Sequence, residues 1–162
     1  MTTTDDVLRN AERYASSFDK GDLPVPPARK LAVVACMDAR LIPTKVLGLQ
    51  EGEAHVIRNA GGMVTDDTIR SLAISQHKLG TEEIILIHHT DCGMFTFRDD
   101  EFRDELREQT GVKATWAGES FSDLERDLRQ SIERIRSSPF IPNKNVRGFV
   151  YEVETGKLRE VS

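Results

Sequence analysis

Two short segments, far apart in the sequence, contain the residues that are best suited to chemistry. The first, Cys36-Met-Asp38-Ala-Arg40, places a thiol, a carboxylate and a guanidinium at alternate positions. The second, His89-Thr-Asp-Cys92, combines an imidazole with the only other thiol of the chain. Thiolates and imidazoles are typical ligands of zinc. If the fold brings the two segments together, Cys36, His89 and Cys92 are predicted to form a metal site.

The number of available ligands indicates which kind of zinc site this is. Structural zinc sites usually have four protein ligands, whereas here His89 is joined by Cys36 and Cys92, and the chain has no third cysteine. Three protein ligands leave the fourth position to water or substrate, and zinc lowers the pKa of a bound water. Two thiolates neutralise the dication, so that water should be less acidic than at a site with three imidazoles. We therefore expect an open hydrolytic site that favours alkaline pH.

The Asp38 and Arg40 side chains are predicted to take part in catalysis. Asp38 can accept a hydrogen bond from the attacking group and orient it, or it can ligate the metal itself and close the site. Arg40 is placed to keep Asp38 ionised through a charge-assisted pair. The plainer interpretation is an ordinary ion pair within a loop.

A parallel sheet would bring the two segments to the same place. Residues 30–35 and 83–88 are apolar runs with β-branched residues, typical of strands buried on both faces. Cys36 directly follows the first run and His89 the second. If these strands are neighbours and a strand at 54–58 lies outside them, the ligands meet at one switch point.

The rest of the chain completes an α/β pattern. Apolar residues at helical spacing, with caps and stop signals, predict the helices, and alternation around a Gly predicts a terminal hairpin. The predicted helices are 4–18, 43–49, 65–79, 99–110 and a long one that starts at a Ser122–Glu125 capping box and ends at Pro139; the hairpin strands are 146–153 and 157–161. The predicted fold class is α/β, with a mostly parallel sheet flanked by helices and an antiparallel C-terminal edge hairpin.

Two parts of the chain are predicted to have different roles. Residues 1–28 form a helix, which Thr4 can cap, and a proline-rich arm that packs on the core or on a partner subunit. Residues 29–162 form the zinc-binding α/β catalytic domain. Asn59-Ala-Gly61-Gly62 is a tight loop whose glycines either contact substrate or only form a turn. Its spacing is not that of a dinucleotide-binding loop, and no acidic residue ends the next strand.

Composition excludes several classes of function. The 162 residues suffice for one domain, and 38% hydrophobic and 30% charged residues fit a globular protein. The net charge of −5, without any basic block, argues against a nucleic-acid partner. No apolar run approaches the roughly 18–20 residues that a membrane span needs. The polar start, without features of a secretory signal, predicts a cytoplasmic protein.

Three motifs together resemble a known family. Cys-x-Asp-Ala-Arg at 36–40, Arg-Asn-Ala-Gly at 58–61 and His-x-x-Cys-Gly at 89–93 are similar to the signature of the β-class carbonic anhydrases. The short chain resembles a compact bacterial branch that also includes carbonyl sulfide hydrolase-like members. The resemblance implies a zinc lyase that reversibly hydrates CO2 to bicarbonate and a proton, with zinc on Cys36, His89 and Cys92 and an Asp38–Arg40 dyad.

The resemblance also has implications for assembly and for substrate. It implies a homodimer or homotetramer in which the N-terminal helix lies on the partner subunit. Carbonyl sulfide is, like CO2, a linear triatomic molecule attacked at carbon, so its hydrolysis to CO2 and hydrogen sulfide at the same zinc is the alternative. A non-catalytic, zinc-stabilised dimer is a more remote one.

Overall fold

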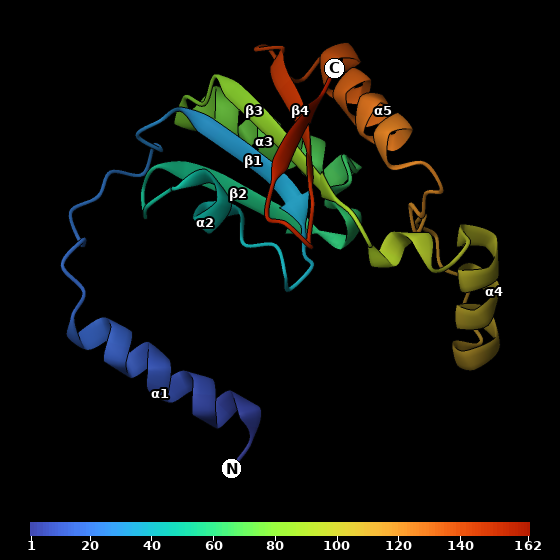
Figure 1. Ribbon diagram of the computed structural model, residues 1–162, viewed down its shortest axis with the longest axis horizontal. Coiled ribbons are helices and arrows are strands. Elements are labelled where there is room, and N and C mark those ends of the chain that lie inside the picture. Colours follow the sequence, from blue (N-terminus) through green and yellow to red (C-terminus); the bar gives the residue numbers. More distant parts are fainter.

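The computed structural model describes all residues from 1 to 162 and is centred on a five-stranded sheet (Figure 1). The strand order is β2-β1-β3-β4-β5. The strands β2, β1, β3 and β4 run parallel to one another, and β5 pairs with β4 in the antiparallel direction. The strands are β1 (Leu31–Cys36), β2 (Ala54–Asn59), β3 (Glu83–His89), β4 (Asn145–Tyr151) and β5 (Leu158–Val161). This confirms the predicted α/β class, the parallel sheet and the antiparallel edge.

The two central strands are apolar because both of their faces are covered. Side chains alternate along each strand, so neighbouring residues belong to different cores. Val34 of β1 and Leu86 of β3 pack in the core that includes α5, whereas Val33 and Ile87 pack in the core on the opposite face. All four are fully buried. The strands β1 and β3 are neighbours and β2 lies outside β1, which is the condition under which the two segments with Cys36 and His89 meet.

Five helices surround or leave this sheet. Among them, α3 contacts β1 and β2, and α5 contacts β3, β4 and β5. In Figure 1, α1 and α4 instead extend away from the sheet, and neither has a buried residue. None of the helices combines the length and apolar character that crossing a bilayer would require. The helices are α1 (Thr3–Ser16), α2 (Pro43–Leu47), α3 (Asp66–Leu79), α4 (Asp99–Thr110) and α5 (Leu124–Ser137).

The helix α1 begins one residue before the predicted start, and its N-cap lies two residues before the predicted cap. Thr2, not Thr4, is the N-cap, and its hydroxyl accepts a hydrogen bond of 3.2 Å from the Asp5 backbone N–H. The Asp5 carboxylate accepts in return from the Thr2 N–H at 2.7 Å. This reciprocal pair satisfies two otherwise unpaired N–H groups, which explains why the helix begins earlier.

The predicted capping box at the start of α5 was also wrong. Asp123 caps this helix and accepts a hydrogen bond of 3.0 Å from the Arg126 N–H. A carboxylate interacts more favourably than a hydroxyl with the positive end of a helix, so Asp123 takes the position predicted for Ser122. Glu125 is then free to pair with Arg159 at 2.8 Å.

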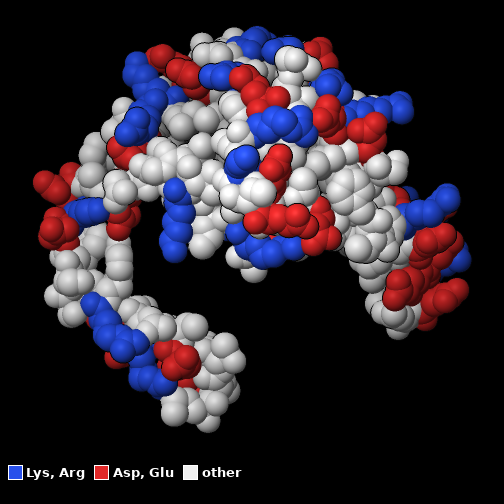
Figure 2. All heavy atoms as spheres, in the orientation of Figure 1, with Lys and Arg blue, Asp and Glu red and all other residues white.

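Charged side chains are intermixed over the molecule. In Figure 2, positive and negative residues alternate over the main body, without a wide field of one sign on the face shown. Many of them form exposed pairs, such as Arg147 with Glu160 at 2.7 Å. The helix α4 begins with a run of acidic residues, Asp99, Asp100 and Glu101, which suits the positive N-terminal end of a helix.

Candidate metal centre

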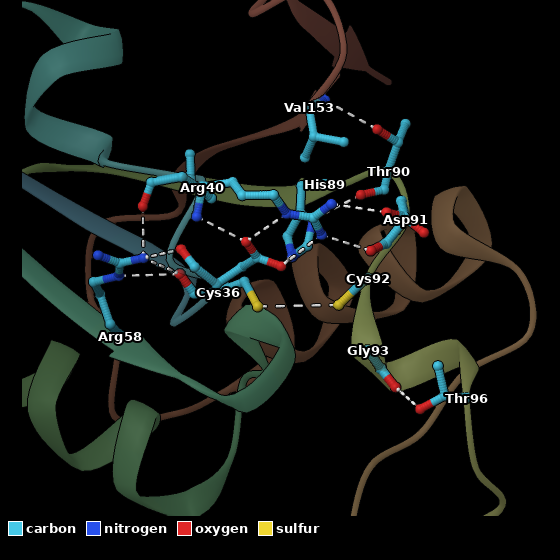
Figure 3. A network of polar contacts seen from close by, with 12 residues as sticks. Cys36, Arg40, Arg58, His89, Thr90, Asp91, Cys92, Gly93, Thr96 and Val153 are labelled. Atoms are coloured by element: carbon cyan, nitrogen blue, oxygen red, sulfur yellow. Dashed lines mark hydrogen bonds and ion pairs between the residues drawn. The ribbon is translucent and has the colours of Figure 1, made fainter.

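The carboxyl ends of β1 and β3 bring the predicted metal ligands together (Figure 3). Cys36 is the last residue of β1 and His89 the last of β3, while Cys92 follows in the next turn. The two sulfur atoms are 4.0 Å apart, and one ligand atom from each of the three residues lies within 4.8 Å of the others. All three residues are buried. Distant parts of the sequence thus place two thiols and one imidazole at a single point.

The hydrogen bonds of His89 fit a metal ligand. Its Nδ1 lies 2.8 Å from the carbonyl oxygen of Thr90, so this nitrogen carries the hydrogen and donates it. Its Nε2 is then the free acceptor, yet it is buried and has no hydrogen-bond partner. Buried polar atoms rarely lack a partner, whereas ligand imidazoles usually have one nitrogen fixed in this way and the other directed at the metal. The donor set of two sulfurs and one nitrogen suits zinc.

The protonation of the three residues is strongly coupled. A hydrogen bond from the Cys92 thiol lowers the pKa of Cys36 to about 4, and the same contact together with burial raises the pKa of Cys92. Burial disfavours the charged form of His89, but contacts with Cys36 and the Thr90 carbonyl outweigh it and raise its pKa. One thiolate therefore forms easily, and a bound dication would displace the proton of the Cys92 thiol and favour the neutral form of His89.

A second set of contacts fixes Asp38. The Arg40 guanidinium donates two hydrogen bonds to its carboxylate, of 3.0 and 2.8 Å, and the Arg40 backbone N–H donates a third of 2.9 Å. These bonds hold the pKa of Asp38 well below its usual range, although partial burial opposes them. Asp38 Oδ2 lies 3.7 Å from the unpartnered Nε2 of His89. The carboxylate is thus ionised and adjacent to the ligand trio.

Arg40 also connects the two ligand segments. Its Nη1 donates to Asp91 Oδ2 at 2.7 Å and its Nη2 to the Asp91 carbonyl oxygen at 2.8 Å, as Figure 3 shows. Asp91 has a positive φ of 51°, which is uncommon for a residue other than glycine. The sequence motifs did not identify this contact, because Asp91 precedes Cys92 in one segment and Arg40 belongs to the other. Only the fold places them side by side.

The glycine loop lies between the two ligand segments, and its two glycines differ. Gly61, with φ of 83°, lines the cavity next to the metal site. Gly62, with φ of 63°, packs against the backbone: a Cβ there would lie 2.8 Å from the Cys36 nitrogen and 2.9 Å from the Ala35 carbonyl carbon. Asn59 fixes the loop, since its side chain accepts from the Met63 N–H at 2.7 Å and donates to the Met63 carbonyl at 2.9 Å.

A cavity of about 710 Å³ opens beside Cys36, Cys92 and Asp38, which line it, whereas His89 does not. Ten of its eighteen lining residues are hydrophobic, and it extends from Cys36 and Cys92 to the base of α4. The large apolar side chains share the lining with polar residues such as Asp67 and Glu119. These apolar side chains are thioethers and aromatic rings: Met37, Met63, Met94, Phe97, Phe102 and Trp116. Phe95, another aromatic residue of this region, packs instead against Phe121 with ring centroids 4.9 Å apart.

His88 points away from the metal ligands, as strand alternation predicts. It is fully buried, and its Nε2 lies 2.7 Å from Asp127 Oδ2 on α5. Its ring also stacks on Phe121, with centroids 5.7 Å apart. His88 therefore joins β3 to α5 and is not a fourth ligand.

Comparisons with known proteins agree with this arrangement. The sequence profile of the carbonic anhydrase family matches residues 31–158. Beta-carbonic anhydrase 1 of Mycobacterium tuberculosis is 59% identical, over 100% of this chain and 99% of that protein. Carbon disulfide hydrolase of Saccharolobus solfataricus is 37% identical, over 96% of this chain and 87% of that protein. The crystal structure of carbonic anhydrase from Streptococcus mutans superposes with a TM-score of 0.93 at 42% identity, covering 100% of this chain and 99% of the other.

Proposed function

This chain belongs to the β-carbonic anhydrase family, and we propose that it reversibly hydrates carbon dioxide to bicarbonate and a proton at zinc held by Cys36, His89 and Cys92. The observation that carries the proposal is the buried, unpartnered Nε2 of His89 beside two thiols 4.0 Å apart. Such a set has no evident structural use without a metal. The 59% identity to a protein named beta-carbonic anhydrase 1 supports the choice of reaction.

Zinc bound there would act as a Lewis acid and lower the pKa of water, so that water loses a proton more easily and becomes a better nucleophile toward carbon. The protein's own contribution centres on Asp38. Its carboxylate, 3.7 Å from His89 Nε2, is placed to accept a hydrogen bond from the attacking water and so direct a lone pair at the substrate. Arg40 supports this role because its two side-chain hydrogen bonds keep Asp38 anionic and oriented. Movement of Asp38 toward His89 would instead let it serve as a fourth ligand.

The cavity suits a small apolar substrate. Carbon dioxide carries no charge, and it gains little from charged walls; the Phe97 and Trp116 rings and the Met94 thioether offer apolar contact instead. We propose that the substrate lies beside Gly61, whose lack of a side chain leaves the backbone accessible, and that Gly62 allows this approach by letting the loop pack on β1.

A sulfur-containing substrate is the second candidate. Relatives named carbon disulfide hydrolase are 36–37% identical to this chain. The thioethers of Met63 and Met94 are polarizable and would pack well against a sulfur atom. Carbonyl sulfide, hydrolysed to CO2 and hydrogen sulfide, would use the same ligands and the same Asp38.

Paired assays on zinc-loaded protein test the two candidates. Stopped-flow detection of proton release measures CO2 hydration, and sulfide release is measured with carbonyl sulfide and with carbon disulfide. We expect CO2 hydration to dominate and to rise toward alkaline pH, because two thiolates leave the metal less electrophilic. Negligible CO2 hydration with rapid sulfide release would reverse the order of the candidates.

We also propose that the protein is a homodimer or homotetramer in the cytoplasm. The helix α1 is amphipathic but buries none of its residues, and it leaves Val7, Leu8 and Tyr14 exposed on one chain. Such a surface is stable in water when a second subunit covers it, so residues 1–28 are proposed to pack on the partner. The two free cysteines suit a reducing compartment.

A further inference from the structure

We propose that Arg58 is a positioning residue, whose guanidinium fixes the loop from Cys36 to Leu41 and thereby sets the geometry of the metal ligand and the Asp38–Arg40 pair. No ligand or substrate need touch Arg58 itself. The role rests on the proposed function only as far as catalysis is concerned. The part that concerns metal retention stands independently of the substrate.

The hydrogen bonds of Arg58 all end on one loop. Its Nε and Nη2 donate to the carbonyl oxygen of Cys36 at 3.0 and 2.8 Å. The same Nη2 donates to the carbonyls of Asp38 at 2.9 Å and of Leu41 at 2.6 Å. In Figure 3 the Arg58 side chain meets this loop from the side opposite Cys92. One cation therefore gathers three carbonyl groups of the segment that contains both a metal ligand and Asp38.

The charge of Arg58 has no other partner. Most arginines of this chain form ion pairs with carboxylates, but none of the ion pairs in the structure includes Arg58. Arg58 is an exposed residue, and carbonyl groups are the only protein partners of its guanidinium. Hydrogen bonds from a charged donor are stronger than neutral ones. The loop has little regular structure of its own, since no residue between Cys36 and Pro43 belongs to a helix or strand. Its other restraints are the Arg40–Asp38 bonds and two backbone bonds, from the Leu41 N–H to the Asp38 carbonyl at 3.1 Å and from the Met37 N–H to the Asn59 carbonyl at 2.8 Å. Arg58 is the side chain from outside the loop that joins its beginning to its end.

The end of β2 explains why a residue outside the two ligand segments can have this role. Arg58 pairs in register with Ala35 of β1, and Asn59 pairs with Cys36. Consecutive strand residues point to opposite faces of the sheet. Arg58 consequently holds the ligand loop, whereas Asn59 holds the glycine loop through its two hydrogen bonds with Met63. Two adjacent residues of an edge strand thus position both loops that form the site.

Shortening Arg58 would release the loop without touching a metal ligand. The Cys36 carbonyl would lose two charged donors, and Cys36 and Asp38 would sample other positions. Losing an outer-shell partner of a metal site typically costs about 10–100-fold in metal affinity or activity. Lysine can supply a charge but not the planar fork that reaches several carbonyls, so Arg58→Lys should retain only part of the function.

The experiment compares Arg58→Ala and Arg58→Lys with Arg147→Ala. Arg147 is a matched control on β4, because its guanidinium pairs with Glu160 and makes no contact with the site. Zinc-loaded proteins are mixed with a chromophoric chelator to measure the rate of zinc release, and cobalt-substituted proteins give the ligand-field absorption spectrum. Values of kcat and KM for CO2 hydration follow, with and without added methylguanidinium at a non-denaturing concentration.

We expect Arg58→Ala to release zinc about 10–100-fold faster than the wild type, with an altered cobalt spectrum and a lower kcat at nearly unchanged KM. Methylguanidinium should restore part of the kcat, Arg58→Lys should be intermediate, and Arg147→Ala should match the wild type. If Arg58→Ala fails to fold, Arg58→Lys alone decides by the same measurements.

Wild-type zinc release and cobalt spectrum in both Arg58 variants would overturn the proposal. An equal loss in Arg147→Ala, or full recovery of function in Arg58→Lys without the fork, would overturn it too. If the wild type itself does not hydrate CO2, the proposed function fails, while the zinc-release rates still decide the role of Arg58.

Discussion

The candidate metal centre and the N-terminal arm (residues 1–28) differ in how many of their side chains are buried or hydrogen-bonded within one chain. At the centre the ligands are buried, and the charged groups around them have several partners each: Arg40 bonds to Asp38 and to Asp91. In the arm, α1 has no buried residue. The arm is linked to the body by the bonds of Tyr14 and Lys20 to the Glu51 carboxylate and, at its last residue, by a bond from the Ala28 N–H to the Gly52 carbonyl at 2.9 Å.

This difference separates chemistry from assembly. Hydrogen bonds within one chain determine the geometry of the candidate ligands and of Asp38. The apolar surface of α1 is exposed on the single chain, and in the proposed assembly a partner subunit covers it. Apolar burial contributes about 25 cal/mol per Å² and is not directional, so the arm can stabilise an assembly without setting angles at the metal. Changes at the centre should therefore affect catalysis, and changes in the arm should affect the association of subunits.

The largest effect is expected from Cys92→Ser. A serine hydroxyl is a poor zinc ligand, so the variant should lose most of its metal and more than about 10³-fold of its CO2 hydration rate, since the acidified water depends on the metal. Zinc analysis and stopped-flow assays measure the two losses. A variant that retains both zinc and activity would contradict the assignment of Cys92 as a ligand.

Asp38→Asn should separate catalysis from metal binding. The amide has the same shape but cannot accept a hydrogen bond as an anion, so kcat should fall by about 10²-fold while zinc content is unchanged. Asp67→Asn is the matched control, because Asp67 lines the same cavity but pairs with Arg70. Unchanged turnover would remove Asp38 from the mechanism, and loss of zinc would identify it as a ligand.

Gly62→Ala tests how tightly the centre is packed. The added methyl group would meet the Cys36 nitrogen at 2.8 Å, and the residue has a positive φ. Backbone strain together with overpacking should lower the free energy of unfolding by about 2–3 kcal/mol. Gly80→Ala is the control, since Gly80 also has a positive φ but nothing lies within 4 Å of its Cβ position. Urea denaturation measures both, and equal losses would contradict the packing argument.

These sites show which part of the structure the sequence could predict. The convergence of Cys36, His89 and Cys92 was predictable because Cys36 and His89 directly follow apolar runs, and parallel strands end at one edge. Sequence spacing carries this information, since it records where each strand stops. The glycines Gly61 and Gly62 were found in the same way, although their separate roles depend on which of the two meets the backbone of β1.

Contacts between side chains and distant backbone groups could not be predicted. Arg58 bonds to carbonyls of a loop, and every residue has a carbonyl, so the sequence around its partners contains no signal. The contact between Arg40 and Asp91 joins two segments whose relative orientation only the fold defines. The caps of α1 and α5 were misplaced because each helix start offers two possible caps for the same N–H groups. Thr2 caps α1 in place of Thr4, and Asp123 caps α5 in place of Ser122.

In the arm, Val7→Asp should weaken the assembly and leave the centre intact. Val7 is 51% exposed on α1, and burying a valine at an interface contributes about 1.5–3 kcal/mol. The dissociation constant of the subunits should therefore rise about tenfold or more. Light scattering after size-exclusion chromatography measures it, with Ser16→Asp as a control that adds the same charge about half a turn away around the helix. Equal dissociation of both variants would point to charge and not to the apolar face.

The smallest effect concerns the link between the arm and the body. The hydrogen bond from Lys20 lowers the pKa of Glu51 to about 2, with a smaller contribution from Tyr14. A carboxylate with a lowered pKa contributes its full stabilisation above its unfolded pKa of about 4.3, and loses it as the pH falls toward about 2. Glu51→Gln should therefore slightly speed hydrogen exchange of the backbone amides of residues 17–23 at neutral pH. Near pH 2, where Glu51 of the wild type becomes protonated, the two proteins should not differ.

Salt distinguishes this link from the contacts of the centre. The side chains of Lys20 and Glu51 are 37% and 46% exposed, so concentrated salt should screen their attraction and reduce the difference between Glu51→Gln and the wild type. Asp38, whose side chain is only 17% exposed and bonded to Arg40, should retain its effect on kcat in the same salt. Tyr14→Phe removes the phenol donor and keeps the carboxylate, which separates the two bonds to Glu51. If salt reduced the Asp38 effect as strongly, the centre would depend on solvent-exposed charge as the arm does, and the contrast between the two regions would be wrong.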